Sequence, residues 1–204
     1  MPPFVQGAVL GFSIAVPVGP IGVLCIRRSI AEGALVGFVC GLGAATADAI
    51  YGAIGAAGLT IVSDLVVRLQ SGLSLLGGLF LCYLGLKTWR SRPADRAARN
   101  DAASLAGAFA TTLLLTLTNP MTILSFAALF AGFGLGRNGQ SWPAAVQLVT
   151  GVFLGSAAWW LILSFGSRRL GARLGAREMT WLNRLSGGVI LGFGFWNLSK
   201  LAFQ

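Results

Sequence analysis

The sequence predicts an all-α membrane protein with six transmembrane segments, and both its composition and the spacing of its apolar runs carry that prediction. Of the 204 residues, 55% are hydrophobic and only 10% are charged, whereas a soluble domain carries about 25% charged residues. The apolar residues also gather in runs of about 20, the length that a helix needs to cross a hydrocarbon core. The chain is therefore expected to fold within a lipid bilayer.

The six predicted spans follow one another with short links. They cover about residues 4–26, 34–59, 65–87, 105–135, 144–166 and 181–203. The N-terminus lacks the basic region of a cleaved signal peptide, so the first span is expected to be retained. We expect a single transmembrane domain over residues 1–204, in which a first repeat (about 1–90) and a second repeat (about 105–204) are joined by a link (91–104).

The lysines and arginines predict which side of the membrane each link faces, because cytoplasmic links carry an excess of them. Twelve of the 15 lie in the first, third and fifth links. These twelve are Arg27, Arg28, Lys87, Arg90, Arg92, Arg96, Arg99, Arg168, Arg169, Arg173, Arg177 and Arg184. The other three lie in positions that belong to the opposite side. Both termini are therefore expected to face away from the cytoplasm.

Two of the spans contain prolines that break a helix, at equivalent places in the two halves of the chain. The first span contains "SIAVPVGPIGVL" from Ser13, and the fourth contains "LLTLTNPMTIL" from Leu114. The third and sixth spans also match, since "LLGGLFLCYLG" and "LSGGVILGFGF" share a glycine pair. Each half holds an odd number of spans, so the two halves would enter the membrane from opposite sides. The pattern predicts an inverted 3+3 repeat, an architecture typical of secondary transporters.

The proline breaks also predict a binding site. Proline lacks an N–H group, so Pro17 and Pro20 release backbone carbonyls, and Gly19 permits close approach of a ligand. Irregular backbone at membrane depth is tolerated only where protein buries it or where it lines a wet cavity. Freed carbonyls and a helix N-terminus suit the two charged groups of a small zwitterion. Asn119 and Pro120 would contribute in the same way, although a simple kink at each break is the alternative.

Asp48 is the only carboxylate deep within a predicted span. An ionisable group at that depth is costly and by default marks a transport pathway or a proton relay. A carboxyl group that alternates between a proton and a substrate ammonium meets the minimum requirement for exchange. The alternative is a structural role, with Asp48 hydrogen-bonded to Thr46 or to a backbone group.

Several other classes of function are disfavoured by the residues present. The net charge of +9 resides in links rather than on one helix face, which argues against binding of nucleic acid. Histidine is absent, and Cys25, Cys40 and Cys82 lie singly in apolar segments, which argues against disulfides, a metal site or a cofactor. The sequence offers no paired carboxylates and no set of nucleophile and base at one depth, which an enzyme would need. The arginine clusters would contact membrane lipids, and most tryptophans, including Trp196, read as interfacial anchors.

These motifs together resemble the LysE/RhtB superfamily of bacterial amino-acid exporters. The resemblance rests on "PVGPIGVLCIRRSIAEG", "GLGAATADAIYGAIGAAGL" and "TNPMTILSF", which occur in the family's order and cover nearly the whole chain. It places the family's glycine-proline element on Gly19 and Pro20, its acidic position on Asp48, and its asparagine-proline element on Asn119 and Pro120. Many members continue with lysine where this chain has Met121. The resemblance implies efflux of an amino acid or related small metabolite across the inner membrane, driven by protons.

Two alternatives stay open from the sequence. A metal-ion exporter of related architecture is disfavoured because one carboxylate and scattered cysteines make a poor transition-metal site. A membrane subunit that transports nothing would also fit the hydropathy. Small residues spaced four apart, as at Gly37 and Gly41 or Gly151 and Gly155, predict close helix packing, either within the chain or across a homodimer.

Overall fold

The structure is a computed structural model, and it describes residues 1–17, 19–56, 70–90, 102–119, 122–123, 125–126, 141–171 and 175–202. All regular structure in these residues is helical, which confirms the predicted all-α class. The helices are α1 (Pro3–Ala15), α2 (Pro20–Glu32), α3 (Ala34–Ala56), α5 (Gln70–Trp89), α6 (Ala102–Leu117), α8 (Trp142–Gly171) and α9 (Ala176–Ala202).

The first predicted span is divided into two helices, as its prolines predicted. The axes of α1 and α2 meet at 83°. Proline is compatible with the first position of a helix, where its missing N–H has no acceptor, and Pro20 occupies that position in α2. At its other end α2 stops at Gly33, whose φ of 113° is open to glycine and strained for other residues. Local sequence therefore sets both ends of α2.

Length and hydropathy allow two of the described helices, α3 and α8, to cross a membrane by themselves, and the bent α1 and α2 pair would make a third span. Residues 74–89 and 105–117 form shorter apolar helices. The fifth predicted span is longer than expected, since α8 has 30 residues. In the fourth predicted span, α6 ends at Leu117, just before the predicted break at Asn119 and Pro120. Residues 127–135 of that span lie outside the described residues.

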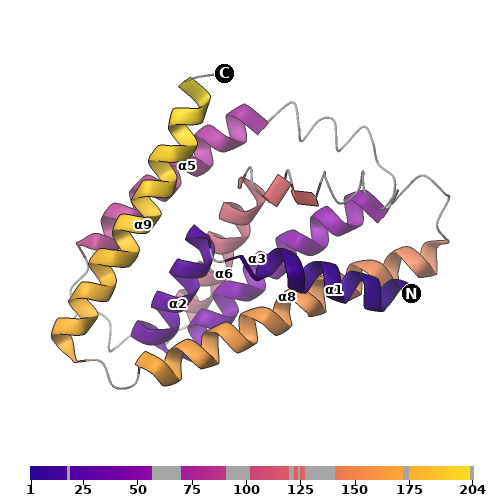
Figure 1. The fold of residues 1–204 in the computed structure, drawn as a ribbon, viewed down its shortest axis with the longest axis horizontal. Helices are drawn as coiled ribbons and strands as arrows, with labels where there is room; N and C mark the ends of the chain where they lie inside the picture. Colours follow the sequence, from indigo (N-terminus) through magenta and orange to yellow (C-terminus); the bar gives the residue numbers. More distant parts are fainter. Residues whose placement is uncertain are drawn as a thin grey trace.

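Four helices pack one against the next in a row. Helix α8 contacts α1 and α3, and α3 in turn contacts α6, so the order in the row is α1, α8, α3, α6. Helix α2 lies against α3 and α8. Helices α5 and α9 form a long pair that touches the rest through α2 and α6 (Figure 1).

Glycines allow the helices of the row to approach closely. A Cβ atom on Gly151 or Gly155 of α8 would collide with the backbone of α1 at Phe4 or Ala8. One on Gly43 of α3 would collide in the same way with α6 at the carbonyl of Phe109. These glycines are therefore used for packing within the chain, as small residues are in other membrane helices.

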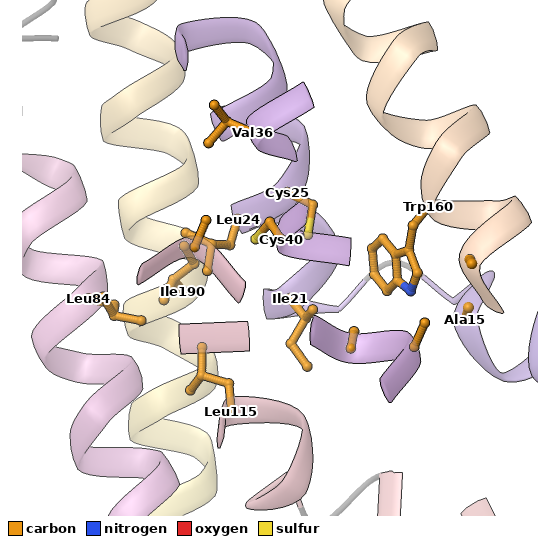
Figure 2. Close-up of a cluster of buried hydrophobic side chains, with 14 residues drawn as sticks. Ala15, Ile21, Leu24, Cys25, Val36, Cys40, Leu84, Leu115, Trp160 and Ile190 are labelled. Carbon is orange, nitrogen blue, oxygen red and sulfur yellow. Dashed lines mark hydrogen bonds between the residues drawn. The ribbon is translucent and has the colours of Figure 1, made fainter. Parts of the chain in front are cut away.

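The main apolar core lies where α2 meets its neighbours. Figure 2 shows Trp160 of α8 extending toward Ala15, the last residue of α1, and toward Ile21 at the start of α2. On the other side of α2, Leu24 approaches Ile190 of α9. This core holds the break between α1 and α2 in place, because residues on both sides of the break belong to it.

Candidate functional site

A cavity of about 350 Å³ lies beside the break between α1 and α2. Ligand sites in proteins occupy roughly 300–1,000 Å³, so this cavity suits a small molecule. Its walls come from every described helix. The lining residues are Ile14, Ala15, Pro17, Gly19, Pro20, Ile21, Gly22, Ala44, Asp48, Leu81, Thr116, Asn119, Thr122, Ser125, Trp160, Phe193, Trp196 and Asn197.

The N-terminus of α2 opens into this cavity. The carbonyl of Gly19 accepts the first helical hydrogen bond, from the N–H of Val23 at 3.0 Å. The first N–H groups of a helix have no acceptor within it, and no side chain caps the start of α2. The backbone of Ile21 and Gly22 therefore offers N–H groups at the cavity wall, where the helix dipole favours a negative charge.

A second turn begins at Asn119, beside the proline that the sequence analysis paired with Pro20. The carbonyl of Asn119 accepts a hydrogen bond from the N–H of Ile123 at 3.1 Å, which repeats the pattern of Gly19 and Val23. Asn119 lines the same cavity. Just before it, the hydroxyl of Tyr51 donates to the carbonyl of Leu117 at 2.6 Å. That bond satisfies a carbonyl freed where α6 ends, as a break within a membrane requires.

Asp48 projects from α3 into the cavity and is held by a side chain of α8. Only 4% of its surface is exposed. The hydroxyl of Ser156 donates to Asp48 Oδ2 at 2.7 Å, and the indole Nε1 of Trp160 donates to Ser156 Oγ at 3.1 Å. These two bonds connect α3 to α8 beside the cavity and fix the direction in which the carboxyl group points.

The structure brings together most of the residues that the sequence singled out. Pro17, Gly19, Pro20, Asp48 and Asn119 all line the cavity. Thr46 has a different position: its hydroxyl donates to the carbonyl of Leu42 on the same helix at 2.8 Å, and it is not among the lining residues. Pro120 and Met121 lie outside the described residues.

Several residues in the cavity or bonded to its lining escaped the sequence analysis. Ser156 is a small polar residue in an apolar span, and nothing local marks it as the partner of Asp48. Trp196 was expected to be an interfacial anchor but lines the cavity with Phe193 and Asn197. Among these residues, only Asn197 carries a clear signal in the sequence, because it is a polar side chain within the last predicted span. Its Nδ2 donates to the carbonyl of Ser74 at 3.0 Å and so ties α9 to α5.

The end of α2 away from the cavity carries a buried charge. Arg27 was expected in a link but is only 2% exposed. Its Nε donates to Asn183 Oδ1 of α9 at 2.7 Å, and its Nη1 lies 4.0 Å from Glu32. Arg168 Nη1 of α8 also donates to the carbonyl of Ile30, at 2.9 Å. Polar contacts thus join α2, α8 and α9 at this end.

Two cysteines that are far apart in the sequence are in contact. Cys25 of α2 and Cys40 of α3 are free and fully buried, with their Sγ atoms 3.2 Å apart (Figure 2). The Sγ of Cys40 also lies 3.0 Å from Thr112 Oγ1 of α6. Among the described residues, no three histidine, cysteine or acidic side chains gather in one place as metal ligands would.

Comparison with known proteins identifies the family of the chain. A family model described as "LysE type translocator" matches residues 12–200. A proposed amino acid efflux protein of Bacillus subtilis is 27% identical over 199 residues, which are 95% of this chain and 93% of the relative. An uncharacterized membrane protein of Pseudomonas aeruginosa is 30% identical over 201 residues, 94% of this chain and 91% of the relative.

A leucine efflux protein of Salmonella typhimurium is 30% identical over 134 residues, 64% of this chain and 61% of the relative. No solved structure matches the chain. The family match covers nearly all the described helices, including both proline breaks and Asp48. The chain therefore belongs to the LysE family of translocators, and it is a multi-pass membrane transporter rather than an enzyme.

Proposed function

We propose that the protein is a secondary active exporter of amino acids or related small metabolites across the bacterial inner membrane, coupled to the entry of protons. The observation that carries this proposal is the cavity in which Asp48 meets the helix break at Gly19 and the turn at Asn119. Sites of this kind, with a half-helix terminus beside a buried carboxyl group, suit the carboxylate and ammonium of one small molecule.

In this mechanism Asp48 carries either a proton or the substrate ammonium. The two cannot occupy the carboxyl group together, so release of one at one side of the membrane permits capture of the other. The hydrogen bond from Ser156 keeps Oδ2 directed toward α8. A buried charge without a partner is strongly unfavourable, which discourages an empty, ionised Asp48 from crossing between states.

The breaks have two roles in the proposal. The N-terminus of α2 holds the substrate carboxylate, with Gly19 and Pro20 shaping its approach. Pro17 and the Asn119 and Pro120 element act as hinges, because a proline has no N–H group to donate to the preceding turn. Thr46 has no direct part in this scheme, since its hydroxyl is bound to its own helix.

An inverted 3+3 repeat accounts for the pairing of the helices. If residues 1–90 and 105–204 are equivalent, then α1 corresponds to α6, α3 to α8, and α5 to α9. The packing of α1 on α8 then corresponds to the packing of α6 on α3. Exchanging the two halves leaves the contact between α3 and α8 unchanged, and it also leaves the contact between α5 and α9 unchanged. This exchange of contacts supports the repeat and six spans.

The positions of the basic residues support an orientation with both termini outside the cytoplasm. Arg27 contacts Asn183 near the start of α9, and Arg168 contacts the end of α2. Gly187, one turn beyond Asn183 in the first half of α9, packs against Trp89 at the end of α5, beside Lys87 and Arg90. The basic ends of α2, α5 and α8 thus lie together, and the excess of positive charge assigns them to the cytoplasm.

Lipids and a second copy of the chain complete the proposed surroundings. Large apolar side chains are exposed along α8, among them Leu154, Leu161 and Ile162, and these would face lipid tails. A homodimer would need a surface other than Gly151 and Gly155, because α1 already covers those glycines.

Flux from proteoliposomes tests the proposed function. Vesicles containing the purified protein would be loaded with a panel of labelled amino acids, with and without an imposed pH gradient. We expect protein-dependent loss of at least one amino acid, which a gradient that drives protons inward accelerates. A rate of amino acid efflux that is the same with and without the gradient would contradict proton coupling. If no amino acid moves, amino-acid export is wrong, and metal ions or other metabolites become the cargo to test.

A further inference from the structure

We infer that the cavity selects amino acids whose side chains are uncharged and apolar, and that Phe193 of α9 sets the size of side chain it accepts. This inference rests on the proposed function, because it concerns the substrate of the same site. It follows from the balance of charges around the cavity, from the chemistry of its wall, and from hydrogen-bonding groups that are already occupied.

The balance of charges excludes a charged side chain on the substrate. Asp48 is the only ionisable side chain among the described residues that line the cavity. It matches the substrate ammonium, and the N-terminus of α2 matches the carboxylate. The two charges of the amino-acid zwitterion therefore use both Asp48 and the N-terminus of α2. A lysine or glutamate side chain would bring a third charge for which these residues offer no opposite charge, and an uncompensated charge in a buried site is costly.

Most of the wall that remains for the side chain is apolar. Leu81 of α5, Ile14 of α1 and Phe193 of α9 line it together with Trp160 and Trp196. The rings of Phe193 and Trp196 meet edge to face, with their centroids 6.3 Å apart. The Nε1 of Trp160 is already bound to Ser156, so its ring contributes apolar surface. Such a wall gains from contact with a branched aliphatic side chain.

Several polar groups of the lining are already engaged within the protein. The Thr116 hydroxyl donates to the carbonyl of Thr112 at 2.8 Å, and the Asn197 amide donates to the carbonyl of Ser74. Each of these side chains therefore uses a donor within the protein, and the larger part of the lining that faces the substrate side chain is apolar. Leucine should be preferred to threonine, although an apolar pocket rejects an added hydroxyl less strongly than an added charge.

Ligand binding tests the selectivity without requiring transport. The full chain, purified in detergent, would be unfolded by heat in the presence of leucine, lysine or glutamate at equal concentration. A ligand that binds the folded state raises the unfolding temperature, and at equal concentration a ligand that binds more tightly raises it more. We expect leucine to raise it and lysine and glutamate to leave it unchanged. A shift with lysine or glutamate that equals or exceeds the shift with leucine would overturn the inference.

Flux of competing substrates tests the role of Phe193. Replacing Phe193→Ala enlarges the wall, so the ratio of phenylalanine flux to valine flux should rise about tenfold, as when a pocket changes by a few carbon atoms. Phe195→Ala is the matched control, since Phe195 lies two residues away and is 64% exposed. It should leave the ratio unchanged. An unchanged ratio in Phe193→Ala, or an equal rise in both variants, would refute the assignment of Phe193.

The two experiments separate this inference from the proposed function. If leucine binds selectively but no amino acid is exported, the selectivity holds and the export mechanism is wrong. If amino acids are exported but charged ones are preferred, export holds and the selectivity is wrong. If none binds and none moves, both are wrong.

Discussion

At the scale of single residues, the site depends on a short chain of hydrogen bonds from Trp160 through Ser156 to Asp48. Asp48 could be predicted from the sequence because a lone carboxylate in an apolar span is expensive. Its hydrogen-bond partner, Ser156, could not be predicted in this way. Thr46 is the nearest hydroxyl along the chain, yet it bonds to its own helix, whereas Ser156 is 108 residues away. Only the packing of α3 on α8 brings the two together.

Removal of the Ser156 hydroxyl should weaken substrate binding without abolishing transport. In Ser156→Ala the carboxyl group of Asp48 loses its donor and is free to rotate, so the substrate ammonium meets a less ordered partner. A hydrogen bond to a charged group contributes roughly 1.5–3 kcal/mol, so the KM for export should rise about tenfold or more. The measurement is the dependence of flux on substrate concentration.

Thr150→Ala is the control for Ser156→Ala. Thr150 lies on the same helix, and its hydroxyl donates to the carbonyl of Val146 on the solvent- or lipid-exposed side. The KM of the Thr150→Ala variant should equal that of the wild type. An unchanged KM in Ser156→Ala would show that the hydrogen bond to Asp48 has no part in binding.

At the scale of helices, the sequence predicts where elements break better than how they pack. Proline and glycine fix the start and end of α2, and the position of the break follows directly from Pro17 and Pro20. The bend of 83° between α1 and α2 does not follow from them. It depends on the core around Ile21 and Trp160, to which residues from distant helices contribute. The glycine spacing correctly predicted close packing, while the choice of partner helix needed the structure.

Substitution of a glycine at the contact of α1 with α8 should destabilise the protein. In Gly155→Ala the new methyl group would overlap the carbonyl of Ala8, so the two helices must separate. Overpacking of this kind costs about 1–3 kcal/mol. The expected result is a lower unfolding temperature in detergent than that of the wild type.

Gly166→Ala supplies the comparison on the same helix. A Cβ atom at Gly166 meets nothing within 4 Å, so the unfolding temperature should stay the same or rise slightly. Equal effects of the two substitutions would contradict the close approach of α1 to α8.

At the scale of the whole molecule, composition and hydropathy are sufficient to predict a helical membrane protein. The count of six spans is harder to establish, because α3, α8 and the bent pair pass a test of length and hydropathy while α5 and α6 are shorter apolar helices. The proposed repeat explains these pieces as parts of two related halves. The ends of α2, α5 and α8 that carry Arg27, Lys87 and Arg168 lie together, as the proposed cytoplasmic orientation of these ends requires.

Reporter fusions test the orientation. Alkaline phosphatase is active only outside the cytoplasm, so a fusion after Gln204 should be active. A fusion within the link at 91–104 should be inactive, because the neighbouring lysine and arginines hold that link in the cytoplasm. The reverse pattern of activity would contradict the orientation, and equal activity at both sites would contradict an odd number of spans between them.

The central claim is that one carboxyl group, Asp48, couples export to protons. The most direct measurement compares gradient-driven amino acid efflux in wild type, Asp48→Asn and Glu178→Gln proteoliposomes. Glu178 is an exposed acid at the start of α9 and controls for loss of a negative charge. The account predicts wild-type efflux for Glu178→Gln and loss of the response to the pH gradient for Asp48→Asn. Full gradient-driven efflux by folded Asp48→Asn would contradict it.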